Sequence, residues 1–380
     1  MNFLNKFLIK ISFVLIYSLT FISIAICQKG SGFRYRAVSK SLISKYYSSN
    51  NKTSYPSGAY VLNQNSFSNN IEKNTNLLQN VLNTNKTVVL PNITLLVAKG
   101  GITLNSNNTL VFQSDSKLII EKNNLPSYEL IKIHNVSNVQ IINANLEGDR
   151  NNHIGSKGEW GYGISIRNSS NVLINNFRIE NFWGDGIAIG YGVTKSSRNI
   201  VIKNGYLDNN RRNGLSVMNV VGLTVNNVLV SNTNGINPMF GVDFEPNNIH
   251  DNLNSISLNN IYSFNNANGG LMLTFSKLKS KTKKNVSFTL NNFTDIGSPN
   301  GLMLAGVPKD APGLEGNISI SNVILDGNKN PITGRTVNNR KVKVDIDGLA
   351  VRNPVNKNVT HKEIKRVFDL KSNYSVKFSQ

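Results

Sequence analysis

Two carboxylates separated by one residue are the strongest candidates for chemistry: Asp243 and Glu245, in Phe240-Gly-Val-Asp-Phe-Glu-Pro246. Alternate side chains of a strand point to the same face, so both would project to one side with Cβ atoms about 6.5 to 7 Å apart. Carboxyl groups roughly 6.5 to 9.5 Å apart suit an inverting glycosidase, in which one acid protonates the leaving oxygen and one base activates water. The alternative is that both are solvated surface carboxylates or partners in ion pairs.

A third acidic candidate is Asp185, in Trp183-Gly-Asp-Gly186, which precedes a similar stretch two repeat units earlier. The spacing between neighbouring strands predicts a distance of about 10 Å between Asp185 and Asp243. Between them in sequence, the adjacent Arg211 and Arg212 would clamp a carboxylate or sulfate group of a sugar. Asp185 between two glycines is equally typical of a turn, and the arginines would also serve simply to neutralise the acids.

Further candidate ligand contacts lie in or beside the same region. Trp183 and Trp160 would either stack on sugar rings or pack under loops. Arg150 and His153 belong to the segment Gly148-Asp-Arg-Asn-Asn-His-Ile. His153 would act as an acid or base or be an ordinary surface residue, and Arg150 would add to the binding of an anionic sugar.

We predict no cofactor for this site. Asp149, Asp185 and Asp243 together would offer oxygen ligands to Ca²⁺, which stands as an alternative that no spacing demands. The excess of basic over acidic residues in the chain disfavours Ca²⁺ binding.

The elements that must position these residues are copies of one repeat unit, of which Leu223–Asn232 is an example. Each copy alternates apolar and polar residues on both sides of an asparagine, as two short strands joined at a hinge would. The hinge asparagines are Asn143, Asn176, Asn204, Asn227, Asn260, Asn292 and Asn322. A glycine opens a third strand after each of the first six hinges, at Gly163, Gly186, Gly214, Gly241, Gly270 and Gly301.

Three strands and three turns per unit predict one coil of an all-β parallel solenoid. Asparagine tolerates left-handed backbone and can bond to the equivalent amide one coil away, so we predict an asparagine ladder. Two longer hinge-to-glycine segments, Glu147–Tyr162 and Ser231–Phe240, would form the walls of a trough. The strands opened by Gly186 and Gly214 would be its floor, flanked by the strand opened by Gly241.

This repeat, over roughly residues 75–330, resembles the pectin-lyase-like right-handed parallel β-helix superfamily. The superfamily includes polysaccharide lyases, polygalacturonase-type hydrolases, mannuronan epimerases and phage tailspikes, so the resemblance implies a single-stranded right-handed parallel β-helix. The segment Phe240–Pro246 is also similar to the epimerase signature of aromatic-Gly-apolar-Asp followed by Pro-His, which implies a catalytic role for Asp243. Phe240 replaces the usual tyrosine and Phe244-Glu245 stands where Pro-His would be, so Asp243 alone is carried over. The paired Asp-Asp and the Gly-His-Gly of polygalacturonases are absent in that form.

The sequence predicts four segments along the chain. An apolar run after Lys6 and Lys10 has the pattern of a secretory signal peptide, and a short helix at Asn69–Asn83 would cap the open end of the solenoid. After removal of the signal peptide we expect no integral membrane span. The predicted segments are a signal peptide at 1–27, a polar lead-in at 28–65, the β-helix at 66–347 and a basic tail or cap at 348–380.

The formal net charge of +20 favours acidic partners over nucleic acid, because no helix-turn-helix, zinc pattern or stripe of stacking aromatics is present. We predict a secreted enzyme that cleaves an acidic polysaccharide, with glycoside hydrolysis by paired carboxylates as the leading reaction. A lyase or uronate epimerase on the same scaffold, and a non-catalytic glycan-binding or adhesin solenoid, remain open alternatives. Nothing in the sequence indicates an oligomeric state.

Overall fold

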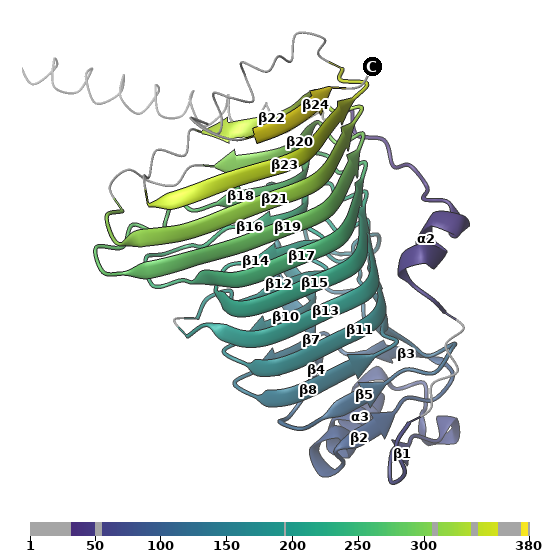
Figure 1. Cartoon of the computed structure of the whole chain (residues 1–380). Coiled ribbons are helices and arrows are strands. Elements are labelled where there is room, and N and C mark those ends of the chain that lie inside the picture. The colour runs from purple at the N-terminus through teal and green to yellow at the C-terminus, as the bar shows by residue number, and fades with distance from the viewer. Residues whose placement is uncertain are drawn as a thin grey trace, which may run out of the picture. The chain divides into compact units, whose positions relative to one another are not determined.

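The computed structural model describes residues 32–49, 55–193, 195–305, 311–335, 341–355 and 374–378. The predicted signal peptide at 1–27 lies outside them. The chain divides after Tyr35, and the description below concerns the unit from Arg36 onward. In this unit, strands of successive coils pair in parallel to form a β-solenoid (Figure 1).

Within the described ranges, two sheets contain the strands. The larger sheet has 15 strands: β1 (Tyr60–Val61), β2 (Thr87–Val89), β3 (Thr94–Val97), β5 (Thr109–Val111), β6 (Lys117–Ile120), β8 (Ser137–Ile142), β9 (Asn145–Glu147), β11 (Ser170–Glu180), β13 (Ser197–Asp208), β15 (Val220–Ser231), β17 (Leu253–Phe264), β19 (Lys284–Ile296), β21 (Leu314–Asp326), β23 (Val342–Arg352) and β24 (Tyr374–Phe378). The smaller sheet has nine: β4 (Ile102–Thr103), β7 (Ser127–His134), β10 (Trp160–Arg167), β12 (Ile187–Ile189), β14 (Leu215–Val217), β16 (Phe240–Phe244), β18 (Gly269–Thr274), β20 (Asn300–Ala305) and β22 (Asn330–Arg335).

The predicted hinge asparagines bend the strands of the larger sheet. All seven have a left-handed backbone, with φ between 53° and 61°. Their side chains link coils, since Asn260 Nδ2 donates to Asn227 Oδ1 at 2.7 Å and Asn227 Nδ2 donates to Asn204 Oδ1 at 2.9 Å. Asn204 itself donates to Asn175 in the preceding coil, one residue before the hinge. The predicted hinge and ladder are therefore confirmed, with local changes of partner.

The smaller sheet keeps the register that the glycine-opened strands predict. Leu215 pairs with Val242 and Val242 pairs with Leu271, and all three are at most 1% exposed. Burial of one such side chain contributes about 1.5–3 kcal/mol, so these aliphatic columns account for much of the stability. Gly214 is required where it stands, because an added Cβ would lie 2.3 Å from Val230 Cγ1.

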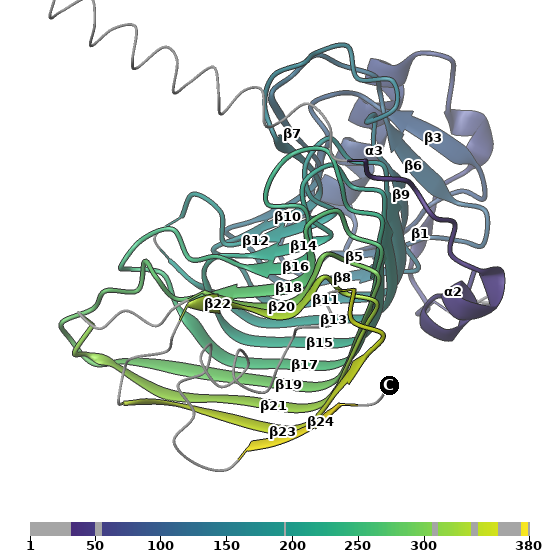
Figure 2. The ribbon, with the colours of Figure 1, turned by 90° about the horizontal axis from the view of Figure 1, so that it is seen from above.

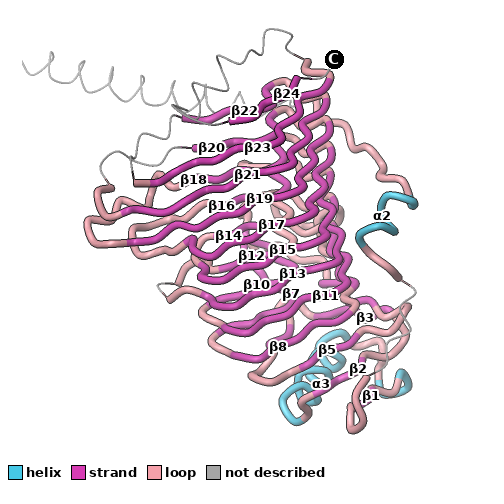
Figure 3. The backbone as a smooth tube through the Cα atoms, in the orientation of Figure 1, coloured by secondary structure: helices cyan, strands magenta, loops and turns pink. Residues whose placement is uncertain are grey.

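The N-terminal end of the solenoid is covered by helix α3 (Ile71–Thr84), which confirms the predicted capping helix (Figure 3). The Asn70 side chain caps it by accepting from Lys73 N, and Leu78 and Leu82 are buried in the core. At the other end, β23 and β24 pair, so the sheet continues past the predicted boundary at residue 347. Part of the predicted basic tail, residues 356–373, lies outside the described residues.

The predicted polar lead-in contains helix α2 (Lys40–Tyr46) and the short 3₁₀ helix η1 (Gln64–Ser66). Helix α2 lies beside the larger sheet (Figure 2), where Tyr46 packs against Tyr206 and Leu229. The backbone N–H of Ser48 donates to the Oδ1 of a ladder residue, Asn176, at 3.0 Å. The described residues around α2 are therefore packed on the solenoid instead of loose. None of the described helices is long and apolar enough to cross a membrane.

Candidate functional site

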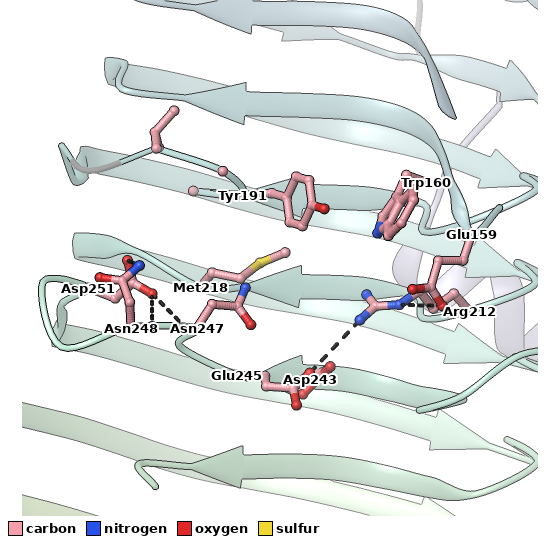
Figure 4. Close-up of a pocket in the computed structure, with 13 residues that line it drawn as sticks. Glu159, Trp160, Tyr191, Arg212, Met218, Asp243, Glu245, Asn247, Asn248 and Asp251 are labelled. Atoms are coloured by element: carbon pink, nitrogen blue, oxygen red, sulfur yellow. Dashed lines mark hydrogen bonds and ion pairs between the residues drawn. The ribbon is translucent and has the colours of Figure 1, made fainter. Parts of the chain in front are cut away.

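A pocket of about 530 Å³ opens on the outer face of the smaller sheet, over β12, β14 and β16 (Figure 4). Its lining comes from the start of β10, the turn after β12, the residues on either side of β14, and β16 with the segment that follows it. The lining residues are Glu159, Trp160, Gly190, Tyr191, Gly192, Val193, Arg212, Met218, Asp243, Glu245, Asn247, Asn248 and Asp251.

Asp243 lies at the base of this pocket. Val242 and Phe244 on either side of it fill the core, so the Asp243 side chain points to the outer face, yet the residue is only 1% exposed. Asn213 Nδ2 donates to Oδ2 at 3.0 Å, whereas Oδ1 has no hydrogen-bond partner among the described residues. Burial, reinforced by the nearby Glu245, raises the pKa of Asp243 well above its usual range. Asp243 therefore keeps its proton to a higher pH than an ordinary aspartate.

Glu245 follows β16 directly and lines the same pocket, but its side chain is 42% exposed. Arg212 Nη2 lies 3.9 Å from Glu245 Oε2. The predicted placement of both carboxylates on one face is confirmed. Glu245 is exposed to solvent, whereas the surrounding segments cover Asp243, so the alternative of two solvated carboxylates does not hold for Asp243.

Asp185 was the predicted third catalytic acid, and the structure places it outside the pocket. It is fully buried and does not line the pocket. Arg212 Nη1 donates to its Oδ2 at 3.1 Å and the backbone N–H of Asn213 donates to its Oδ1 at 3.0 Å. Burial raises the pKa of Asp185, and Arg212 opposes this shift. Asp185 is therefore the anchor that fixes Arg212 at the pocket wall.

The Arg212 guanidinium is the positive group among the described lining residues. Burial disfavours its charge, but Asp185 and then Asp243 outweigh burial and raise the pKa of Arg212. Arg212 Nε also faces Glu159 Oε2 at 3.9 Å. The predicted clamp thus has one arginine in the pocket, and this arginine is already paired with a buried acid.

Asn213 is a site residue that the sequence interpretation missed. It is fully buried, and its Nδ2 donates to Ser216 Oγ at 2.9 Å as well as to Asp243. Its Oδ1 accepts from Phe240 N at 2.9 Å. Asn213 therefore joins β14 to β16 and fixes one oxygen of Asp243. Its position directly before the strand-opening Gly214 is the sequence feature that could have identified Asn213 as a site residue.

Arg211, Trp183 and His153 form a stack outside the pocket, which corrects their prediction as sugar contacts. The Arg211 guanidinium lies 3.7 Å from the Trp183 ring centroid and donates to the Gly158 carbonyl at 2.7 Å. The His153 ring stacks on Trp183 at 3.9 Å. The His153 side chain is fully buried, with its Nδ1 2.7 Å from Asp149 Oδ2, so it is neither a surface group nor a pocket group.

The predicted second wall of the trough, Ser231–Phe240, is wrong. Arg150 holds that loop by donating to Asn234 Oδ1 at 2.6 Å and to the Asn209 carbonyl at 2.6 Å, away from the pocket lining. The second wall is instead the segment after β16, in which Asp251 Oδ2 accepts from the backbone N–H of Asn247 at 2.7 Å (Figure 4). Arg150 consequently supports a loop and does not contact this pocket.

Two aromatic rings form the opposite side of the pocket. Trp160, a predicted sugar platform, and Tyr191 both line it, with ring centroids 6.3 Å apart and an interplanar angle of 29°. The Arg167 guanidinium lies 5.6 Å from the Tyr191 ring. The sequence interpretation did not identify Tyr191. Trp160 remains a candidate stacking surface for a sugar ring.

The three aspartates of the Ca²⁺ alternative do not meet. Asp149 bonds to Asn123 and Tyr128 as well as His153, Asp185 pairs with Arg212, and Asp243 stands apart at the pocket. The described residues contain no group of three metal-ligating side chains.

Comparisons with known proteins agree with this fold. The family model "Right handed beta helix region" matches residues 81–249. The Family 28 exopolygalacturonase of Yersinia enterocolitica superposes with a TM-score of 0.58 at 14% identity, covering 79% of this chain and 67% of that chain. The polygalacturonase of Erwinia carotovora has a TM-score of 0.52 at 16% identity, covering 84% and 95%. At these identities the likeness concerns the fold alone.

Two proteins of Bacillus subtilis are related in sequence. The uncharacterized protein YclG is 29% identical over 160 residues, which are 38% of this chain and 27% of YclG. The SPbeta prophage-derived uncharacterized protein YorA is 31% identical over 163 residues, 38% of this chain and 28% of YorA. The aligned part therefore spans little more than a quarter of each relative.

Proposed function

We propose that the outer pocket of this right-handed parallel β-helix hydrolyses a glycosidic bond of an acidic polysaccharide. The proposal rests on the difference in environment between the two carboxyl groups at the end of β16. Asp243 is buried with a raised pKa and one unbonded oxygen, and Glu245 is solvent-accessible. Pairs of titratable groups in contrasting environments are typical of acid and base partners. The names of the two polygalacturonases support a uronate polymer as the substrate class.

In the proposed reaction, Asp243 is the general acid and Glu245 the general base. Asp243 Oδ1 donates its proton to the glycosidic oxygen as the bond to the anomeric carbon breaks, and the leaving sugar departs as an alcohol. Glu245 takes a proton from the water whose oxygen bonds to that carbon. Both groups then return to their starting states by exchanging protons with solvent. Asn213 holds Asp243 Oδ2, so the unbonded Oδ1 is the oxygen left to face the substrate.

The spacing of the two residues favours an inverting reaction. Two residues along a strand place Cβ atoms about 6.5–7 Å apart, which leaves room for a water between the carboxyl groups. Trp160 would stack on the sugar ring from the opposite side of the pocket.

A lyase or epimerase would need an unprotonated base beside the uronate carbon. Arg212, the arginine of the pocket, is bonded to Asp185 and its pKa is raised, which opposes that role. A non-catalytic binding surface gives no reason to bury Asp243 with an unbonded oxygen, since an unpaired buried polar group costs about 1–3 kcal/mol. Both observations support hydrolysis.

We further propose that the protein acts outside the cytoplasm. The support is the sequence pattern of residues 1–27, two lysines followed by an apolar run, which is typical of a secretory signal peptide.

The test is incubation of the purified protein with polygalacturonate and a panel of other uronate and sulfated glycans, reading new reducing ends and ultraviolet absorbance together. We expect reducing ends without ultraviolet-absorbing products, and a loss of about 10²-fold or more in kcat for Asp243→Asn and for Glu245→Gln. Glu72→Gln, an exposed change on α3, is the matched control and should retain full activity. Unsaturated products, unchanged chain length with altered sugar, or full activity of both variants would each overturn hydrolysis by this pair.

A further inference from the structure

The pocket wall is acidic where the proposed cleavage takes place. Glu159, Asp243, Glu245 and Asp251 line it, against the single arginine among its described lining residues. A polyanionic chain therefore finds little positive charge at the pocket itself. If the substrate is an acidic polysaccharide, most of its anionic groups must bind elsewhere on the protein.

A cluster of lysines lies in the connection between β18 and β19. We name residues 275–284, which are this connection and the first residue of β19, the lysine loop. Lys277, Lys279 and Lys281 are exposed and alternate with Leu278 and Ser280, which are buried at 0% and 7% exposure. This alternation fixes the backbone of the loop through its buried residues and leaves the side chains of Lys277 and Lys281 on the exposed side.

The lysine loop is joined to the pocket. Lys284 Nζ donates to the carbonyls of Ile249 and Asp251, the latter at 2.6 Å, and these residues belong to the segment that forms the second pocket wall. Strand β16, which carries Asp243, pairs directly with β18, which leads into the loop. Adjacent strands lie about 4.8 Å apart, so the loop follows the pocket one coil further along the solenoid.

We propose that the lysine loop binds carboxylate or sulfate groups of the polysaccharide on one side of the bond placed over Asp243. This assignment rests on the proposed function for the position of the cleaved bond, and on charge complementarity for the ligand. The exposed residues of the loop include no aromatic side chain, because Phe275 is buried. Single-stranded nucleic acid is normally bound by stacking aromatics together with basic groups, so the loop fits an anionic glycan better.

The test is equilibrium binding in the Asp243→Asn background, where the ligand stays intact. The probes are polygalacturonate and its fully methyl-esterified form, which share a backbone and differ in charge. The double variant Lys277→Ser, Lys281→Ser should bind polygalacturonate about tenfold more weakly at low salt and the esterified form unchanged. Its matched control is Lys73→Ser, Lys86→Ser, which removes the same charge from exposed positions in and near α3, away from the pocket. The tenfold difference should shrink as salt rises.

Three outcomes would overturn the assignment. These are equal polygalacturonate affinities for the two double variants, equal weakening toward both probes, and loss of single-stranded DNA binding from the loop variant with polygalacturonate binding intact. The outcome is separable from the proposed reaction. Loop-dependent binding without hydrolysis in the parent protein would end the proposed function alone, whereas hydrolysis with loop-independent binding would end this inference alone.

Discussion

Asp295 in β19 should make the stability of the protein fall as the pH rises toward neutrality. Its side chain is fully buried, and Ser263 Oγ and Ser298 Oγ donate to Oδ1 at 2.6 and 2.8 Å. Asn328 Nδ2 donates to Oδ2 at 2.6 Å. Burial outweighs these donors and raises the pKa of Asp295 to about 7. The fold therefore favours the neutral form of a group that ionises near its ordinary pKa of 3.8 in the unfolded chain.

The sign and size follow from linkage. A folded-state pKa above the unfolded value means that the contribution to stability is complete below the unfolded pKa and is lost as the pH rises through the folded pKa. The free energy of unfolding should fall by about 1.4 kcal/mol per pH unit between pH 4 and 7, or about 4 kcal/mol in all, from this residue. Above pH 8 the contribution should be flat.

The assay is urea unfolding at pH 5, 6, 7 and 8 for the parent and for Asp295→Asn, which cannot ionise. The absolute stability of the variant also reflects its altered bonds to Asn328, so the measured quantity is the change with pH of the difference between the two proteins. That difference should move by about 3 kcal/mol in favour of the variant from pH 5 to 8. Parallel pH profiles would refute the raised pKa and the reasoning from burial.

Four other variants test separate parts of the structure. Asn213→Ala removes a hydrogen bond that favours the ionised form of Asp243, so kcat should fall about tenfold and the basic limb of the pH–rate profile should move to higher pH; an unmoved limb would contradict this role. Trp160→Ala should weaken glycan binding by about 1 kcal/mol with little change in melting temperature, whereas Trp183→Ala should lower the melting temperature and spare binding; titration and thermal unfolding would expose the reverse pattern. Asn260→Ala removes two ladder bonds and leaves alanine in a left-handed backbone, so unfolding in urea should show a loss of about 2–3 kcal/mol; a loss under about 0.5 kcal/mol would show that the ladder adds nothing.

The coils could be predicted from sequence because each coil is specified locally. An asparagine that must adopt a left-handed backbone and a glycine that must admit a neighbouring chain, as at Gly214, are visible wherever they recur. The ends were less predictable, since the boundary at residue 347 was placed where the repeat fades and the structure keeps pairing through β23. Strand pairing at an end needs compatible neighbours, which repeat periodicity does not encode.

The second pocket wall was missed because loop lengths were compared on one side of the strands alone. From the strand-opening Gly241 to the next hinge, Asn260, there are 19 residues, against 13 from Gly214 to Asn227. The extra length lies after β16, where Asn247 and Asp251 form the wall. The segments that follow Gly186, Gly270 and Gly301 are of similar or greater length, at 18, 22 and 21 residues to the next hinge. Their lengths would have pointed to this side of the strands without singling out the segment after β16.

Residue types alone could not predict which of the two carboxyl groups, Asp185 or Asp243, is hydrogen-bonded to Arg212. This difference determines which of them can act as the acid. Both carboxyl groups are almost fully buried, and burial raises the pKa of each. Arg212 can place Nη1 within bonding distance of one of them, and it bonds to Asp185. Since one cation cannot compensate two buried carboxylates at once, Asp243 is left with an amide donor on one oxygen and none on the other among the described residues. Burial and the nearby Glu245 outweigh the opposing charge of Arg212 and raise the pKa of Asp243, and an acid with a raised pKa that faces a pocket is able to give up a proton there. Asp243 is therefore assigned as the acid of this site because Arg212 donates a hydrogen bond to Asp185 and, among the described residues, no cation donates one to Asp243.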